Sequence, residues 1–121
     1  MTLLVWCGVA ALGSIGALLR FVVDTQIQAR ASDQLPLGTL AVNLGGALVL
    51  GVLTGAHVGG DALLLAGTGF LGAYTTFSTW MFETQRLAEE GEGRIALGYV
   101  AASVAGGLAC GALGWAIGTL L

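Results

Sequence analysis

The sequence predicts an all-α membrane protein with four transmembrane helices, the third of which is broken in the middle of the membrane. Three observations predict this fold class. Of the 121 residues, 56% are hydrophobic and only 9% are charged, whereas a soluble domain carries about 25% charged residues. Four stretches stay apolar over about 20 residues, the length that crosses a bilayer. A run of hydroxyl side chains interrupts the third stretch.

The chain is expected to form a single domain of four spans. The first span is interpreted as retained, because it lacks the basic region and the cleavage pattern of a signal peptide. The second starts with Pro36, a residue suited to the first turn of a helix. The predicted spans cover residues 3–23, 36–56, 62–83 and 95–121.

Three polar segments connect these spans. Residues 24–35 include Arg30 and Asp33, residues 57–61 form a tight turn, and residues 86–94 are mostly charged. With four spans, both termini lie on one side of the membrane and the first and third connections lie on the other. All four basic residues belong to that other side, and basic residues tend to stay cytoplasmic, which predicts that both tails are outside. They are Arg20, Arg30, Arg86 and Arg94.

Small residues recur at four-residue spacing in the second and fourth spans. The chain contains 21 glycines, and paired small residues on one helix face let a neighbouring helix approach closely in lipid. The spacing therefore predicts a compact helix bundle. The pairs are Gly51 and Gly55, Gly107 and Gly111, and Gly114 and Gly118.

The hydroxyl run of the third span is Thr75-Thr76-Phe77-Ser78-Thr79, and Gly67, Gly69 and Gly72 precede it. One Ser or Thr can bond back to its own helix, but four hydroxyls beside three glycines indicate a place where the helix unwinds. Unwound backbone at membrane depth must be buried in protein or line a watery cavity, and broken helices of this kind bind ions. The alternative is a polar contact between packed helices.

Four other polar residues have two interpretations each. Asn43 forms an interhelical hydrogen bond or offers an N–H to an anion. Glu83 is solvated at the membrane surface or acts in the mouth of a pathway. Arg20 reaches the headgroups or makes a vestibule attractive to anions, and Tyr99 anchors the chain at the interface or joins a polar track. Catalytic motifs and basic clusters are absent from the sequence, so neither an enzyme nor nucleic-acid binding is expected.

At these residues the sequence resembles the Fluc-type fluoride channels, the CrcB family. The resemblance covers essentially the whole chain and is most specific in two motifs, Gly-Thr-Leu-x-Val-Asn and Thr-Thr-Phe-Ser-Thr. It runs through residues 16–20, residues 38–43 and residues 69–79.

The resemblance implies a dimer of two inverted subunits with two pores, through which fluoride leaves the cytoplasm across the cell membrane. It implies that Asn43 contacts fluoride, that Phe77 presents the positive edge of its ring to the anion, and that Arg20 and Glu83 are vestibule or gating candidates. A polar track along the pore is implied for Ser78, Thr79 and Tyr99. A structural sodium ion held by backbone carbonyls is implied for Gly72 and Thr75.

Two features depart from the family pattern. Trp80 stands where the family has a second phenylalanine of the pore; its indole edge is also positive and adds an N–H, but the ring is larger. A self-inverting homodimer needs nearly balanced charge, whereas the arginines of this chain are all on one side. The hypothesis that follows is a heterodimer with a separately encoded, oppositely oriented homologue.

Two other classes of protein compete with the channel. Four-span multidrug exporters also work as inverted dimers, but they use an acidic residue in the first span, and this chain has no Asp or Glu before Asp24. A non-transporting subunit that only stabilises a partner would not need a polar break in its third span.

Overall fold

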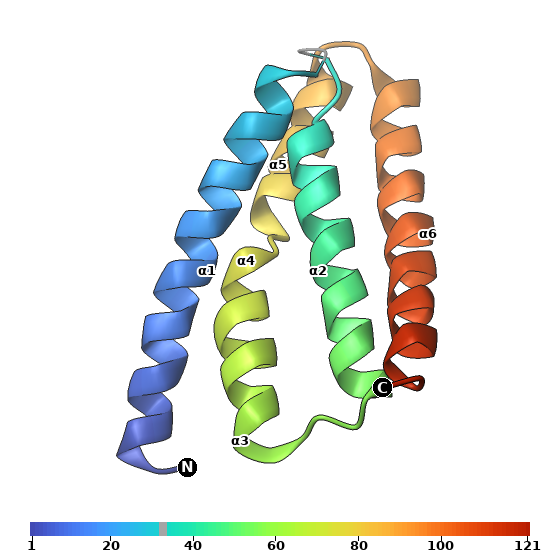
Figure 1. Ribbon diagram of the computed structural model, residues 1–121. Helices are drawn as coiled ribbons and strands as arrows, with labels where there is room; N and C mark the ends of the chain where they lie inside the picture. Colours follow the sequence, from blue (N-terminus) through green and yellow to red (C-terminus); the bar gives the residue numbers. More distant parts are fainter. Residues whose placement is uncertain (32–33) are drawn as a thin grey trace.

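The computed structural model describes residues 1–31 and 34–121, and these residues form an antiparallel helical bundle (Figure 1). The bundle has four arms. The first, second and fourth arms are the continuous helices α1, α2 and α6, and the third arm is divided into α3, η1, α4 and α5. Both termini lie at one end, while the α1–α2 and α5–α6 connections lie at the other (Figure 1). The elements are α1 (Leu3–Ala29), α2 (Leu37–Gly55), α3 (Gly60–Leu63), η1 (Leu64–Leu71), α4 (Gly72–Tyr74), α5 (Ser78–Glu89) and α6 (Gly93–Gly118).

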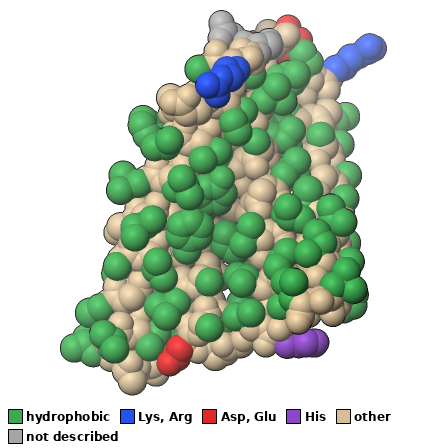
Figure 2. Space-filling model, in the orientation of Figure 1, with side chains coloured by type: hydrophobic (Ala, Val, Ile, Leu, Met, Phe, Trp, Pro, Cys, Tyr) green, Lys and Arg blue, Asp and Glu red, His purple; other side chains and the backbone are tan. Residues whose placement is uncertain are grey.

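This arrangement confirms the predicted all-helical class with a broken third arm. Helices α1, α2 and α6 are each long and apolar enough to cross a membrane. The flank seen in Figure 2 is covered by hydrophobic side chains, and the charged side chains on that face gather at the two ends. An apolar flank between polar ends is typical of a protein that spans a bilayer.

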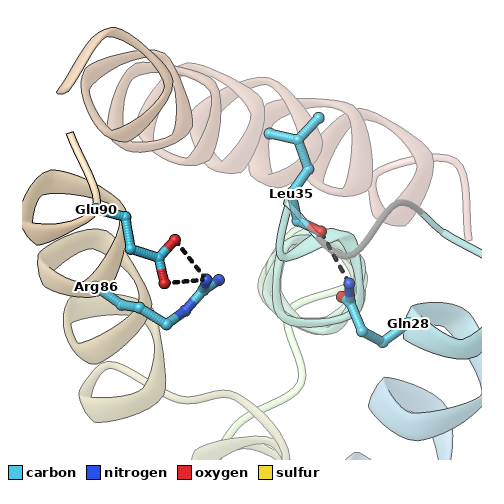
Figure 3. Close-up of polar contacts among 4 residues, drawn as sticks. All are labelled: Gln28, Leu35, Arg86 and Glu90. Atoms are coloured by element: carbon cyan, nitrogen blue, oxygen red, sulfur yellow. Dashed lines mark hydrogen bonds and ion pairs between the residues drawn. The ribbon is translucent and has the colours of Figure 1, made fainter. Parts of the chain in front are cut away.

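Two helices continue further than the sequence predicts. Helix α1 extends through residues 24–29, which were expected to be a connection, and α5 extends to Glu89. Polar residues beyond the hydrocarbon can stay helical because water or neighbouring side chains satisfy them. Gln28, within this extension of α1, satisfies backbone groups at the start of α2. Its Oε1 accepts from the N–H of Gly38 (3.1 Å), and its Nε2 donates to the Leu35 carbonyl (2.9 Å; Figure 3). Asp33 lies outside the described residues.

Helices α2 and α6 share the most extensive contact among the described residues, and glycines make it possible. A Cβ at Gly51 would overlap the Gly111 carbonyl, and a Cβ at Gly114 would overlap the Leu48 carbonyl. Gly55 and Gly118 meet backbone of the opposite helix in the same way. Two of the predicted glycine pairs therefore form this contact. Of the third pair, Gly111 lies in this contact through its carbonyl, whereas a Cβ at Gly107 would face open space.

The glycines that precede the break have a different role from the predicted one. They were expected to mark unwinding, but residues 64–71 stay helical as the wider π-helix η1, which packs against α1. A Cβ at Gly69 would lie 3.2 Å from Val9 Cα, and a Cβ at Gly16 would overlap the Phe70 carbonyl. A π-helical turn is rare and is frequently found at functional sites. Here it leads directly into the break.

Candidate functional site: the break in the third arm

The break is a short extended segment between two capped half-helices. Helix α4 ends at Tyr74, and Thr75 has extended backbone (φ −81°, ψ 162°). The N–H and the hydroxyl of Thr75 both donate to the Leu71 carbonyl, each at 3.0 Å. On the other side, the hydroxyl oxygen of Thr76 accepts from the N–H of Thr79 at 3.2 Å, as an N-cap residue does. The hydroxyl run thus ends one helix and starts the next.

Asn43 of α2 holds this segment from the side. Its Nδ2 donates to the Thr76 carbonyl (2.9 Å), and its Oδ1 accepts from the Thr76 N–H (2.8 Å). One amide therefore satisfies both backbone groups of a residue that no helix satisfies. The interhelical hydrogen bond expected for Asn43 is present, and a primary amide has a second Nδ2–H that this pairing does not use.

The pairing with Asn43 also changes the chemistry of the half-helix ends. In an unbroken α-helix the Thr76 N–H would bond to the Gly72 carbonyl, but here it bonds to Asn43. The C-terminal end of α4 therefore presents carbonyl oxygen, which favours cations, and the N-terminal end of α5 presents amide N–H, which favours anions. The two ends face one another across Thr75 and Phe77.

Arg20 of α1 reaches the break. Its Nη1 donates to the Thr75 carbonyl at 3.2 Å, and the side chain is half-buried. The guanidinium therefore lies against the interrupted helix. Arginines within membrane spans are costly and usually face the bundle interior, where they pair with backbone carbonyls, as Arg20 does here. Arg20 therefore no longer counts among the basic residues at the connection end of the bundle, where Arg30, Arg86 and Arg94 remain.

Three cavities among the described residues border the break or the polar residues of α1 and α5 beyond it. The break cavity, about 400 Å³, is lined by α2, by the third arm and by residues that include Asn43 and Thr76. The arginine cavity, about 210 Å³, lies on the other side of Thr76. The end cavity, about 530 Å³, shares Asp24 with the arginine cavity. The arginine cavity is lined by Ala17, Arg20, Phe21, Asp24, Thr39, Val42, Thr76 and Thr79. The end cavity is lined by Asp24, Thr25, Gln28, Ala29, Pro36, Glu83 and Arg86.

The aromatic residues of the site differ sharply in exposure. The Phe77 side chain is 70% exposed and lines the break cavity. Trp80 lines the same cavity, with its ring centre 5.7 Å from that of Phe77 at an interplanar angle of 78°. Tyr99 is buried against Leu87 and Ala96, so its interpretation as an interface anchor is wrong. Burial instead brings Tyr99 close to the α5 residues of the site.

Glu83 and the remaining hydroxyls complete the polar lining. Glu83 is half-buried, and its Oε1 accepts from the Thr39 hydroxyl at 2.6 Å, so it is not simply solvated. Ser78 is exposed at the start of α5, and the Thr79 hydroxyl accepts from Thr76 at 3.2 Å. At the outer end of α5, Arg86 pairs with Glu90 at 3.2 Å (Figure 3).

The structure therefore brings together most of the residues that the sequence singled out. Asn43, Gly72, Thr75, Phe77 and Trp80 line one cavity, and Arg20 and Thr79 line its neighbour. Tyr99 lies behind Trp80 in the α5–α6 contact.

Sequence reasoning missed two threonines that organise the site. Thr76 was seen only as part of the hydroxyl run, although it caps α5 and pairs with Asn43. Thr39, which is 2% exposed, was seen only as a motif residue, although it holds Glu83. A Thr just before the start of a helix is a capping signal that could have marked Thr76, although the Glu or Gln that completes a capping box is replaced by Thr79.

Comparison with known proteins gives a family match over most of the chain and several similar relatives. Residues 7–115 match the family model described as CrcB-like protein, Camphor Resistance (CrcB). A protein of Mycolicibacterium paratuberculosis named fluoride-specific ion channel FluC 2 is 53% identical over 99% of this chain and 98% of its own length. A FluC 2 of Moorella thermoacetica is 44% identical (91% and 93% covered), and a FluC 1 of Streptomyces avermitilis is 49% identical (85% and 86% covered).

Proposed function

We propose, because this chain belongs to the CrcB family of membrane ion channels, that it forms a fluoride-selective channel through which fluoride leaves the cytoplasm. The observation that carries the proposal is the interrupted third arm with an amide, a guanidinium and hydroxyls converging on it. A polar site of this kind inside an apolar bundle costs free energy, and in membrane proteins such sites mark ion pathways. The exporter alternative has no support, since the relatives above are named as ion channels.

The pore is proposed to follow the break cavity and the start of α5. Three groups offer an anion partial positive charge without an ionic charge, which suits a small anion. They are the second Nδ2–H of Asn43, the ring edge of Phe77 and the N-terminal end of α5. Ser78, Thr79 and Tyr99 continue the path as hydroxyl donors, and Trp80 forms its wall. Exposure of Phe77 and Ser78 in the single chain supports this assignment.

Arg20 and Glu83 are proposed to control the approach to the pore. The Arg20 guanidinium has five N–H donors, and one of them bonds to the Thr75 carbonyl, so the others can attract an anion into the arginine cavity. Glu83, held by Thr39 at the edge of the end cavity, is a carboxylate that an anion must pass. Together they form a vestibule whose charges nearly cancel.

Backbone carbonyls of Gly72 and Thr75 are proposed to hold a structural sodium ion. Neutral oxygen donors suit a hard cation, and the Gly72 carbonyl lacks the N–H that a continuous helix would give it. The Thr75 carbonyl accepts from Arg20, but a carbonyl has a second lone pair for a metal. Sodium would supply positive charge at the carbonyl end of α4.

A second, inverted chain is proposed to complete the pores. Gly72, Phe77 and Ser78 are exposed in the single chain, and lipid cannot satisfy the backbone groups of an interrupted helix. A partner chain must therefore cover this surface, and the partner is either an identical chain or a homologue of opposite orientation.

Liposomes that contain the purified chain are expected to release trapped fluoride faster than empty liposomes, and to retain chloride. A fluoride electrode measures the release after valinomycin dissipates the potassium gradient. If the chain is inactive alone, the assay is repeated with a family member of opposite orientation. Absence of release in both cases would overturn the proposed channel.

Phe77→Ala is expected to lower this fluoride release about fivefold, because an aromatic edge contact contributes about 1 kcal/mol and each 1.4 kcal/mol is a factor of ten. The matched control is Phe82→Ala, since Phe82 is 69% exposed on the same helix but does not line the break cavity. Equal rates for the two variants would remove Phe77 from the pore.

The two dimer types predict different membrane orientations. With three arginines still at the connection end, we expect a C-terminal tag to be accessible only from outside the cell, which favours a heterodimer. Labelling of the tag on intact and on opened cells measures this. Equal labelling on both faces would instead support the homodimer.

A further inference from the structure

Asp24 of α1 lies where two of the cavities described above meet. It lines the arginine cavity together with Arg20, and it lines the end cavity together with Glu83. The arginine cavity borders the break, and the end cavity leads to the connection end of the bundle. An anion that moves between the break and the connection end through these two cavities therefore passes Asp24.

The carboxylate of Asp24 has a defined position against the start of α2. A Cβ at Gly38 would overlap Asp24 Oδ1, so a side chain there would displace the carboxylate. Asp24 is half-buried and follows Arg20 by four residues on α1, which puts both residues on the same helix face. Among the described residues, Asp24 forms neither a hydrogen bond nor an ion pair. Its negative charge is therefore not neutralised by direct contact.

The charges along this path do not cancel once Asp24 is counted. Arg20 supplies one positive charge, whereas Asp24 and Glu83 supply two negative charges that are close enough to repel each other. Arg86 also lines the end cavity, but it is paired with Glu90 at 3.2 Å (Figure 3). The path is thus net negative by one charge. A passage that only had to attract an anion would not need the second carboxylate.

We infer that Asp24 shortens the time that fluoride spends beside Arg20 and thereby keeps the anion moving between the arginine cavity and the water. The inference rests on the proposed function and deepens it by assigning a positioning residue that acts through the field of Arg20. An ion pathway must bind its ion strongly enough to admit it and weakly enough to release it. A guanidinium in a half-buried cavity attracts an anion strongly, and a carboxylate one helical turn away weakens that attraction by repulsion.

Asp24→Asn tests this role, because it removes the charge, keeps the size and breaks no hydrogen bond among the described residues. Fluoride release from liposomes is measured over a series of trapped fluoride concentrations, which gives a half-saturating concentration and a maximal rate. We expect the half-saturating concentration to fall about tenfold, an effect between that of a screened surface charge and that of a buried one. The maximal rate should fall as well, because fluoride that is held more tightly leaves more slowly.

Glu89→Gln is the matched control for the loss of charge. It removes one negative charge from the same end of the bundle, but Glu89 is exposed and lines none of the three cavities. Both measured values should equal those of the wild type. Asp24→Ala is a second variant that should lower the half-saturating concentration as Asp24→Asn does. Poor folding lowers only the maximal rate, since the half-saturating concentration does not depend on the number of active channels.

The outcomes distinguish this inference from the proposed function. Wild-type liposomes that release no fluoride overturn the proposed function and the inference with it. Wild-type release with a half-saturating concentration that neither Asp24 variant lowers overturns only the role of Asp24. A lower half-saturating concentration with a maximal rate that does not fall also overturns it, because fluoride is then not retained beside Arg20.

Discussion

Asn43→Ala is expected to lower fluoride release about 100-fold, since leaving the N–H and the carbonyl of Thr76 unpaired costs about 3 kcal/mol in total and each 1.4 kcal/mol is a factor of ten. In the wild type, one side chain satisfies both groups, at 2.8 and 2.9 Å. Without it, Thr76 must find other partners, and the half-helices on either side shift. The free Nδ2–H proposed to contact fluoride is lost at the same time. Fluoride electrode recordings from liposomes measure the effect.

Two further variants of α2 show whether the clamp is the cause. Asn43→Asp keeps the size and the acceptor for the Thr76 N–H, but it sets a carboxylate oxygen against the Thr76 carbonyl and adds negative charge, so release should fall at least as far. Thr54→Ala is the control, because the Thr54 hydroxyl bonds only to Leu50 and Gly51 of its own helix. A normal rate for Asn43→Ala would contradict both the clamp and the pore assignment.

The number of arms and the location of the break could be predicted because both follow from local chemistry. An apolar stretch of about 20 residues has few alternatives to a membrane helix, and four hydroxyls in five residues compete with the helix backbone. The ends of α1 and α5 could not be predicted in the same way. Whether Asp24 or Arg86 lies on a helix depends on which partners the polar groups of that segment find. The partners of Gln28, Leu35 and Gly38, are brought close only by the fold.

The candidate site shows a similar division. Asn43 could be singled out because an amide inside an apolar span is unusual, whereas Phe77 and Trp80 were singled out only through the family resemblance. Arg20 bonds to the Thr75 carbonyl because α1 packs closely against η1. Gly16 and its neighbours allow this close packing. Snorkelling and burial of an arginine leave the same sequence pattern, so only the packing of α1 decides between them.

Gly114→Val is expected to destabilise the folded chain by about 3 kcal/mol, the upper part of the range for overpacking, because the added carbons would overlap backbone rather than flexible side chain. The Leu48 carbonyl lies where a Cβ of residue 114 would be, and the Leu48 carbon and Val52 nitrogen are each 3.0 Å from that position. Helix α6 must then move away from α2. Reversible unfolding in detergent, followed by circular dichroism, measures the loss.

Gly107→Val provides the matched control for this prediction. It makes the same change on the same helix, with the same loss of glycine and the same gain of apolar surface, but its Cβ faces open space. Its stability should stay within about 0.5 kcal/mol of the wild type. Equal destabilisation by both variants would mean that helix propensity, and not the approach of α6 to α2, is the cause. Since α2 carries Asn43 and α6 carries Tyr99, only Gly114→Val should also slow fluoride release.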